Sequence, residues 1–413
     1  MNNVDGAEKL RVNSSNSAAP TLVVVVLAAM AAQIASAMGI AIFPVIAPHL
    51  AKMLGVDASM VGYQISILFG AAMVASSMVG NIVLRWGACQ AMQWALWLSA
   101  AGMAAGLAGN LYLMPLAAIF IGASNALAAA GAAHLLFRFG PPQHRNLVFS
   151  IKQTGVPLGW ATIALVAPVL TVHYGWRVPL MVVLVYSVAG ALWLARYRRH
   201  WDDDRDPQAA AQTNLLTGVA VLWRYPTLRY LAMGACFFSF AQLCLGTFTV
   251  NLLVQEAQYS LVAAGVMLSL VQIAGMCGRL VFGWIADRSG HALGVLVVTS
   301  LVVAACCVVT MFVSGSWPIA ALALFYIVFG IAGYGWNGVM HAQFARLSPP
   351  GMVSVATGGM MVWVFGGILV GPSTFAAAYQ WIGSYTATFG ALAIIALAGA
   401  AGAVIAARAE RSA

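Results

Sequence analysis

The sequence predicts an all-α membrane protein with twelve transmembrane helices in two pseudo-symmetric six-helix bundles, N-in and C-in. The first observation is composition: of 413 residues, 62% are hydrophobic and 7% are charged, whereas about a quarter of the residues in a soluble domain are charged. The second is the recurrence of long apolar stretches, and the third is the position of the basic residues between them. No soluble core absorbs so much apolar surface.

Apolar stretches of the length that a spanning helix needs, about 20 residues, recur along the whole chain. Residues 1–19 are polar and are predicted to form a cytoplasmic tail. The apolar run that follows is too long for a cleaved signal peptide, so it is predicted to be an uncleaved anchor. Residues 408–413 are predicted to form a second cytoplasmic tail. The predicted spans are 20–46, 59–84, 89–109, 113–137, 146–171, 177–197, 227–253, 261–285, 291–314, 317–345, 352–377 and 383–407.

The longest gap between spans, residues 198–226, divides the chain into an N-terminal bundle, 20–197, and a C-terminal bundle, 227–407. Its charges predict a solvated cytoplasmic linker. Consecutive aspartates on a flexible segment do not converge on one ion, so no metal site is predicted there. The gap contains Arg198, Arg199, Asp202, Asp203, Asp204, Arg205, Asp206 and Pro207.

The formal net charge is +9, which in a soluble protein would raise the question of a nucleic-acid partner. With a cytoplasmic N-terminus, the lysines and arginines fall in cytoplasmic segments, apart from Lys52, Lys152, Arg177 and Arg279. The positive-inside rule then indicates an N-in, C-in topology with an even number of helices. The excess of basic residues therefore indicates how the protein is oriented in the inner membrane. No nucleic-acid partner is predicted.

The cysteines have no spacing that suggests a metal cage or a disulfide framework. All of them lie in or at the edge of apolar segments, where small membrane-core residues are expected. No metal and no other cofactor is predicted. The six residues are Cys89, Cys236, Cys244, Cys277, Cys306 and Cys307.

The two predicted bundles share an internal repeat. Glycines, prolines and loop arginines match at steady offsets, whereas chance matches between apolar sequences would mostly be Ala, Leu and Val. The repeat indicates a duplication. At an offset of 203, Gly62, Ser66, Gly80, Arg85 and Gly87 match Gly265, Ser269, Gly283, Arg288 and Gly290; at 208, Gly122, Arg138, Pro141, Pro142 and Gly159 match Gly330, Arg346, Pro349, Pro350 and Gly367.

The loop after the eighth span carries the most specific motif. Gly283, Asp287, Arg288 and Gly290 are spaced as G-x-x-x-D-R-x-G, which resembles the loop motif between helices 8 and 9 of the major facilitator superfamily. The resemblance covers essentially the full chain. It implies two bundles related by an axis along the membrane normal, a binding site between them at the midplane, and alternating access by rocking. It also implies that Asp287 and Arg288 belong to a conformational lock at the cytoplasmic face.

The equivalent loop after the second span departs from the family pattern. It keeps Gly80, Arg85 and Gly87, but Leu84 stands where the family usually has aspartate. The resemblance implies that Arg85 belongs to the lock and that the lock is weaker in this half. Asp287 and Arg288 are then expected to hold more of it.

Charges inside the predicted spans are few and positive. A charge in the hydrocarbon costs about 2.5 to 3.5 kcal/mol on insertion scales, so each one is a functional hypothesis. Every acidic residue lies outside the apolar segments or at their ends: Asp5, Glu8, Asp57, Asp202, Asp203, Asp204, Asp206, Glu256, Asp287 and Glu410. The interior is therefore predicted to favour an anion.

Arg279 and Lys152 are the predicted anion partners. Arg279 precedes Asp287 by eight residues, about 12 Å of helix rise. Its spacing is similar to that around the helix 8 arginine of monocarboxylate and oxalate/formate transporters, where that arginine binds the substrate carboxylate. A guanidinium suits this role because it makes two parallel hydrogen bonds. The alternatives are a structural arginine near Asp287, and a Lys152 side chain that extends to the cytoplasmic surface.

Neutral groups complete the predicted site. Asn337 and His341 are four residues apart, hence on one face of a helix, and Tyr334 and Trp336 are expected to line the cavity with them. Asn125 and Gln272 are further substrate-binding candidates, and His134 is a candidate proton carrier. Each of these residues has the alternative of simply bridging helices. Gln33, Gln153, Gln242, Asn251 and Trp363 are weaker candidates of the same kind.

We therefore predict a monomeric, multi-pass secondary transporter that moves a small organic anion, a carboxylate, across the inner membrane by alternating access. The main alternative is a proton-coupled drug or metabolite efflux pump. Against it, no carboxylate lies deep in a span, and Gly155 and Gly159 are followed by Trp160 where exporters of the family have a proline step. A membrane sensor or an enzyme is the remaining alternative, but no catalytic group of residues occurs together.

Overall fold

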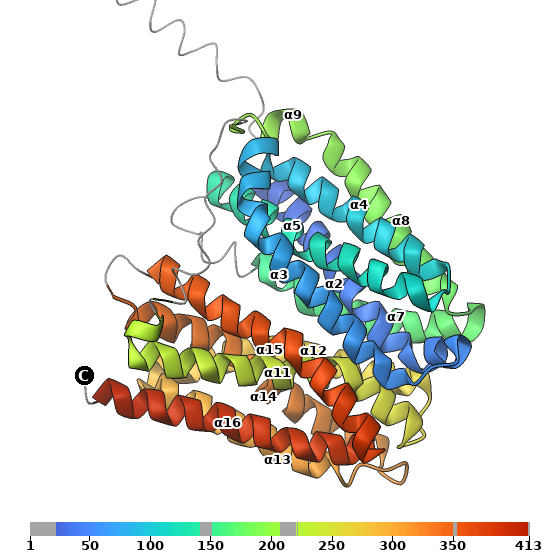
Figure 1. Cartoon of the computed structure of the whole chain (residues 1–413), viewed down its shortest axis with the longest axis vertical. Helices are drawn as coiled ribbons and strands as arrows, with labels where there is room; N and C mark the ends of the chain where they lie inside the picture. The colour runs from blue at the N-terminus through green and yellow to red at the C-terminus, as the bar shows by residue number, and fades with distance from the viewer. Residues whose placement is uncertain (1–21, 141–150, 207–219, 221, 350–352, 412–413) are drawn as a thin grey trace, which may run out of the picture.

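The computed structural model describes residues 22–140, 151–206, 220, 222–349 and 353–411. In these ranges the chain is helical and forms no strand. The long helices of the first half are α2 (Leu22–Leu54), α3 (Val61–Trp86), α4 (Ala88–Leu107), α5 (Met114–Phe139), α7 (Gly155–Tyr174) and α8 (Arg177–Ala195). Those of the second half are α11 (Pro226–Gln255), α12 (Leu261–Ser289), α13 (Ala292–Thr310), α14 (Ile319–Leu347), α15 (Val353–Ile382) and α16 (Tyr385–Arg411). Figure 1 shows their arrangement.

Each predicted span corresponds to one long helix. In the described part of the chain, eleven helices are long and apolar enough to cross a membrane. The other long helix is α4, whose Gln90 and Gln93 lower its hydropathy. The predicted tail 1–19, linker residues 207–219, and Pro141, Pro142 and Pro350 of the repeat lie outside the described residues.

Helix α2 extends well beyond its predicted span, which ends at residue 46. The helix continues to Leu54 through Pro44 and Pro48, although an interior proline removes one hydrogen bond and favours a helix end. Packing outweighs this preference, because Phe43 and Ile46 are 1% and 0% exposed. The predicted C-terminal tail is also shorter, since α16 extends to Arg411.

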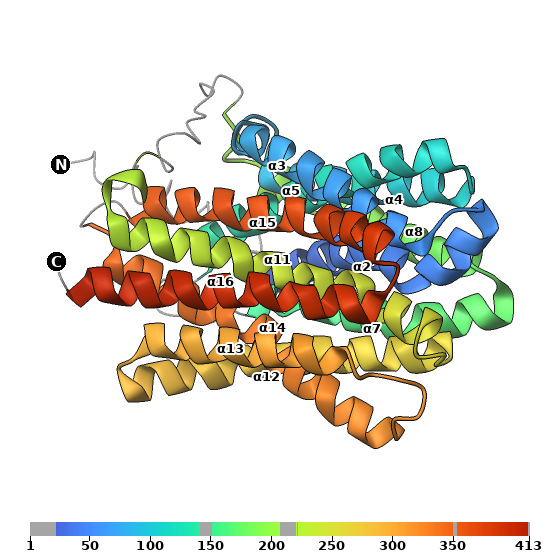
Figure 2. The ribbon, with the colours of Figure 1, turned by 60° about the horizontal axis from the view of Figure 1, so that its bottom comes forward.

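The two sets of helices pack mainly through three pairs: α3 with α15, α7 with α12, and α2 with α11. Figure 2 shows the long helices lying roughly along one common axis. Because successive helices alternate in direction, α2 begins and α16 ends at the same end of the bundle. This end, which also carries the short helix α9 (Arg198–Trp201), is called the terminal face, and the other end the opposite face.

Glycines mediate the contacts between the halves in pairs that follow the repeat. A Cβ atom at Gly62 of α3 would overlap the carbonyl oxygen of Pro372 in α15, and one at Gly265 of α12 would overlap that of Ala164 in α7. Ala164 and Pro372 are themselves 208 residues apart. The same contact therefore recurs at the offsets that the sequence predicts.

A second pair of glycine contacts lies inside the halves. Gly122 of α5 faces the carbonyl oxygen of Leu68, and Gly330 of α14 faces that of Val271. Leu68 and Val271 are 203 residues apart. Only glycine allows two helix backbones to approach this closely, which explains why these glycines recur in both halves.

The described contacts between the halves lie toward the opposite face. Ser269 of α12 donates to the Ala161 carbonyl at 2.8 Å, and Asn251 of α11 donates to the Ala58 carbonyl at 3.1 Å. Toward the terminal face, Asp287 and Arg288 at the end of α12 are exposed. The molecule is therefore in a state whose halves meet at the opposite face.

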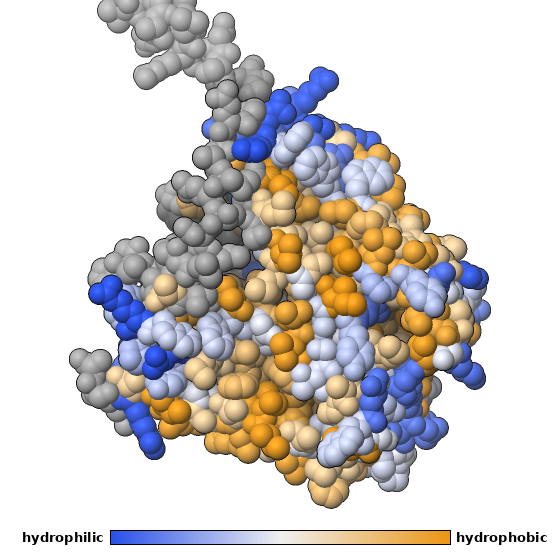
Figure 3. Space-filling view, viewed as in Figure 1, coloured by the Kyte–Doolittle hydropathy of each residue, from blue (hydrophilic) through white to orange (hydrophobic). Residues whose placement is uncertain are grey.

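The outer surface is apolar between two polar ends. Figure 3 shows apolar residues over the middle of the helices and hydrophilic residues toward their ends. Large exposed apolar side chains include Leu280 at 74%, Ile394 at 69% and Leu324 at 63%. This distribution matches a lipid-facing surface.

Candidate functional site

Arg279 lies beside a close contact between α12 and α14. A Cβ atom at Gly278 would overlap the backbone of Ile331, and one at Gly275 would lie 2.5 Å from the Cβ atom of Tyr334. These glycines bring the helix axes together, so the half-buried Arg279 side chain reaches the backbone of α14. Its Nε atom donates to the Tyr334 carbonyl oxygen at 3.4 Å.

The other nitrogens of the Arg279 guanidinium have no carboxylate partner among the described residues. A guanidinium carries five N–H donors, and an arginine inside a membrane protein normally pairs with an acid or with backbone carbonyls. One long hydrogen bond satisfies one of the five. The guanidinium therefore keeps the capacity to bind an anion through two parallel hydrogen bonds.

Tyr334 links Arg279 to the contact between the halves. Its hydroxyl accepts a hydrogen bond from Nε2 of Gln272 at 3.0 Å, and both side chains are buried. The same hydroxyl lies against Gly246 of α11, which also faces the ring of Trp160 from α7. Tyr334 thus lies where helices of both halves meet.

Asn337 extends this cluster to α11. Its Nδ2 atom donates to the Tyr334 carbonyl at 3.1 Å and to Oε1 of Gln242 at 2.9 Å. The indole N–H of Trp336 donates to the same Gln242 oxygen at 2.9 Å. The structure therefore brings together Arg279, Gln272, Tyr334 and Asn337 of the predicted site, with Gln242, one of the weaker candidates.

His341 lies one turn further along α14 with an exposed side chain, and its Nδ1 atom is 2.7 Å from the Asn337 carbonyl oxygen. Asn125 lies in the other half, where its Oδ1 atom accepts from the Ser36 hydroxyl at 3.1 Å and joins α5 to α2. No described contact connects Asn125 to the cluster around Tyr334.

Lys152 is buried, with 6% of its surface exposed. Its Nζ atom donates to Oε1 of Gln153 at 3.2 Å, and no ion pair joins it to a described carboxylate. Antiparallel α7 and α12 place Ala161 beside Ser269. Lys152 precedes α7 and Arg279 lies in the later part of α12, so both residues lie on the terminal-face side of this contact.

The described carboxylates near the opposite face serve as helix caps. Glu256 accepts from the backbone N–H of Thr386 at 2.8 Å and from that of Tyr385, so it caps α16. Asp57 accepts from the backbone N–H of Ser59 at 2.7 Å. Both carboxylates are held at helix N-termini, where their charge is favourable.

A groove of about 360 Å³ on the opposite face lies within the first half, between α2, α3 and α5. Its walls are mostly apolar, and Asp57, Tyr63 and Gln64 contribute polar groups. None of the predicted substrate-binding residues lines it. The groove and the cluster around Tyr334 are therefore separate.

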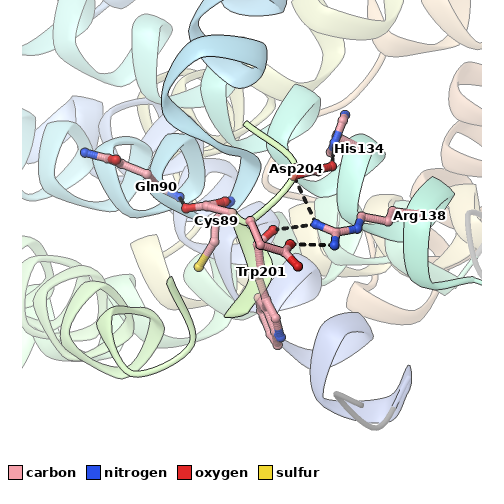
Figure 4. A network of polar contacts seen from close by, with 8 residues as sticks. Cys89, Gln90, His134, Arg138, Trp201 and Asp204 are labelled. Carbon is pink, nitrogen blue, oxygen red and sulfur yellow. Dashed lines mark hydrogen bonds and ion pairs between the residues drawn. The ribbon is translucent and has the colours of Figure 1, made fainter. Parts of the chain in front are cut away.

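At the terminal face, the acidic run after α8 folds back onto the first half. Asp204 lies 2.8 Å from Nε2 of His134 and 3.0 Å from Arg138, and Asp203 lies 2.5 Å from Arg138. Arg138 also donates to the Trp201 carbonyl at 3.1 Å. Figure 4 shows His134 and Arg138 of α5 beside Trp201, at the end of α9, and Asp204, which follows it. His134, the candidate proton carrier, is thus bonded to the linker.

Asp202 caps the first turn of α4. Its two oxygens accept from the backbone N–H groups of Cys89 at 2.7 Å and of Gln90 at 2.9 Å (Figure 4). Asp202 is 5% exposed, so the prediction of a solvated linker is wrong at this residue. The sequence reading missed the cap because these residues are more than 110 positions apart.

The environment shifts the pKa values of two of these acids in opposite directions. Burial raises the pKa of the Asp202 carboxyl, and the hydrogen bonds from the backbone N–H groups of Cys89 and Gln90 oppose this rise. The hydrogen bond from Arg138 lowers the pKa of Asp203. The Asp203–Arg138 pair therefore adds to the free energy of unfolding at neutral pH, and this contribution is lost as the pH falls through the lowered pKa of Asp203.

The predicted lock residues lie at the terminal face. Arg85, Asp287 and Arg288 are exposed, and the Arg288 guanidinium lies 5.8 Å from the ring centroid of Trp284. In the loop that lacks the family aspartate, Gly87 has a φ of +102°, and a Cβ atom there would overlap the Asp202 carboxylate. Asp202 thus brings a carboxylate from the linker to the loop in which Leu84 replaces the acid.

Comparison with known proteins gives the family. The sequence model of the Major Facilitator Superfamily matches residues 29–372. Two proteins from two strains of Mycobacterium tuberculosis, both named as uncharacterized MFS-type transporters, are 32% identical over 157 residues. The match covers 36% of this chain and 33% of each relative, so it spans about a third of the relatives' length.

Solved transporters share the fold. A bacterial homologue of the human lysosomal transporter Spinster, in an inward-facing and occupied conformation, has a TM-score of 0.75 at 14% identity, over 95% of this chain and 98% of that one. The peptide transporter POT in complex with sulfate has a TM-score of 0.75 at 16% identity, over 94% and 95%. At such low identity the likeness shows the fold alone. With the family match over most of its length, this chain belongs to the major facilitator superfamily.

Proposed function

We propose that this chain is a secondary transporter that carries a small organic anion, a carboxylate, across the inner membrane by alternating access. The observation that carries the proposal is the Arg279 guanidinium, which lies among packed membrane helices with no described carboxylate partner. Such a charge costs about 2.5 to 3.5 kcal/mol to insert. A substrate carboxylate would supply the missing partner.

Lys152 supports the same proposal from the other half. It is buried and has no described acidic partner, and like Arg279 it lies on the terminal-face side of the contact between Ala161 and Ser269. A carboxylate between the halves would then meet a cation on each side. When the halves rock, these cations approach or leave the anion together, as alternating access requires.

The proposed orientation places the terminal face in the cytoplasm, following the basic residues. The halves meet at the opposite face, so this state would open toward the cytoplasm. The Spinster homologue of similar fold was solved inward-facing. The contact at Gly62 and Gly265 would be the closed outer gate.

The contacts of Glu256 and Asp57 count against the efflux-pump alternative. A proton-coupled exporter of cations needs a titratable acid that faces the substrate. Glu256 instead binds the first backbone N–H groups of α16, and Asp57 binds that of Ser59. No described carboxylate contacts the cluster around Tyr334, so we do not propose this alternative.

Uptake of a panel of labelled carboxylates into proteoliposomes tests the proposal. Wild type is expected to take up at least one of them, and Arg279→Ala is expected to raise its KM by about 10- to 100-fold, because a hydrogen bond to a charged group is worth about 1.5 to 3 kcal/mol.

The control is Arg346→Ala, which removes an exposed ion pair with Glu410 and is expected to stay within about twofold of wild type. The proposal fails if no carboxylate is taken up, or if Arg279→Ala behaves like the control.

A further inference from the structure

Trp336 fixes the orientation of the Gln242 amide. An indole nitrogen only donates hydrogen bonds, so the Gln242 atom 2.9 Å from Nε1 of Trp336 has to be the oxygen. Amide oxygen and nitrogen are otherwise easily exchanged. Here a donor-only partner removes that ambiguity, and the Gln242 NH2 group must point away from Trp336.

The orientation of Asn337 follows from that of Gln242. The Gln242 oxygen requires a donor, so Asn337 presents its Nδ2 atom at 2.9 Å. The same nitrogen donates to the Tyr334 carbonyl at 3.1 Å, which also requires a donor. Two independent acceptors therefore agree on the orientation of Asn337.

The side-chain amides of Gln242 and Asn337, called the amide pair, are hydrogen-bonded on one side and open on the other. Among the described residues, no partner binds Nε2 of Gln242 or Oδ1 of Asn337. Both side chains are only half-buried. The open side therefore offers two N–H donors on Gln242 next to one acceptor on Asn337.

Arg279 belongs to the same network. Its Nε atom and Nδ2 of Asn337 donate to one shared atom, the Tyr334 carbonyl oxygen. A ligand carboxylate on the guanidinium would thus lie beside the amide pair. The substituent next to the carboxylate of the ligand would then face the open N–H donors of Gln242 and the open oxygen of Asn337.

We propose that Gln242 and Asn337 bind a hydroxyl group of the transported carboxylate, so that the substrate is a hydroxy acid; this inference rests on the proposed function. A hydroxyl both donates and accepts, so it satisfies Asn337 Oδ1 and Gln242 Nε2 at once. An oxo group only accepts and leaves the Asn337 oxygen unpaired. An ammonium group only donates and leaves the Gln242 N–H groups unpaired. Trp336 acts as a positioning residue.

The test compares close analogues of the carboxylate that wild type takes up best: the unsubstituted acid, its 2-hydroxy and 3-hydroxy forms, and its 2-oxo form, all of one chain length. KM is measured for each. At least one hydroxy acid is expected to have a KM about 10- to 100-fold below that of the unsubstituted acid. Its hydroxyl would make two hydrogen bonds, and each neutral hydrogen bond is worth about 0.5 to 1.5 kcal/mol.

Three variants then locate the preference. Gln242→Leu removes the N–H donors, and Gln242→Glu removes them while keeping the acceptor that Trp336 and Asn337 need for folding. In both, the KM ratio of unsubstituted to hydroxy acid is expected to fall to near one. Trp336→Phe frees the Gln242 amide to turn, and is expected to raise the KM of the hydroxy acid about 3- to 10-fold more than that of the unsubstituted acid.

The matched control is Gln93→Leu, the same substitution in α4, where Gln93 donates to the Ala191 carbonyl at 3.1 Å. It is expected to keep the wild-type ratio. If carboxylates are taken up but wild type does not prefer a hydroxy acid, or if both Gln242 variants keep the preference, this inference is overturned and the proposed function stands. If no carboxylate is taken up, both fail.

Discussion

Gly62→Leu is expected to reduce transport to the background rate. A leucine side chain at Gly62 would collide with the Pro372 carbonyl oxygen and with Ala376 across the contact between the halves. Backbone atoms cannot turn aside as a side chain does, so the halves would have to stay apart at the opposite face. A transporter that cannot close one face cannot complete alternating access.

The graded variant Gly62→Ala separates this effect from helix propensity. Alanine favours a helix over glycine by about 1 kcal/mol, so α3 itself should become more stable. Overpacking costs about 1 to 3 kcal/mol, which predicts uptake about 5- to 100-fold slower. Gly265→Ala is expected to slow uptake to a similar extent, because a Cβ atom at Gly265 would meet Ala164 and Pro168 of α7, which match Pro372 and Ala376 of α15 in the repeat.

The matched control is Gly358→Ala in α15, where an added Cβ atom meets nothing within 4 Å. Initial uptake rates in proteoliposomes, normalised to the amount of inserted protein, provide the measurement. Wild-type uptake by the double variant Gly62→Ala, Gly265→Ala would show that the halves need not approach this closely during transport.

Asp202→Ala is expected to lower the free energy of unfolding by about 2 to 4 kcal/mol. The substitution removes two hydrogen bonds to a carboxylate, each worth about 1.5 to 3 kcal/mol. It leaves the N–H groups of Cys89 and Gln90, at the start of α4, without an acceptor in a buried environment. Loss of a helix cap alone costs about 1 kcal/mol.

Thermal unfolding in detergent measures this effect, and Asp203→Ala is the neighbouring control. Asp203 is 59% exposed in its ion pair with Arg138, and exposed pairs contribute at most about 1 kcal/mol. If the two alanine variants unfold at the same temperature, Asp202 does not stabilise α4 in the way we describe.

The sequence predicted the helices well because membrane spans depend on composition over about 20 residues, a local property. It misjudged the end of α2, where Pro44 and Pro48 favour termination and only tertiary packing keeps the helix intact. Part of the repeat was visible because the close packing of two helix backbones leaves room only for glycine, as at Gly62 and Gly265.

The candidate site could be predicted only in part. Arg279 was identifiable because a charge in an apolar run is conspicuous, but nothing local indicates that its nearest acceptor is a backbone carbonyl of α14. Gln242 looked like any polar residue in a membrane helix, since its importance comes from Trp336 and Asn337, more than 90 positions away. The cap by Asp202 is likewise a long-range contact.

The uncompensated charge of Arg279 also offers a route to the substrate that needs no transport assay. Any anion that pairs with this guanidinium binds the folded chain and not the unfolded one, so it must raise the unfolding temperature. At a hundred times its Kd the gain is about 2.7 kcal/mol. Screening a library of acids by thermal shift, with Arg279→Ala as the blank, would rank the natural ligands of the purified protein.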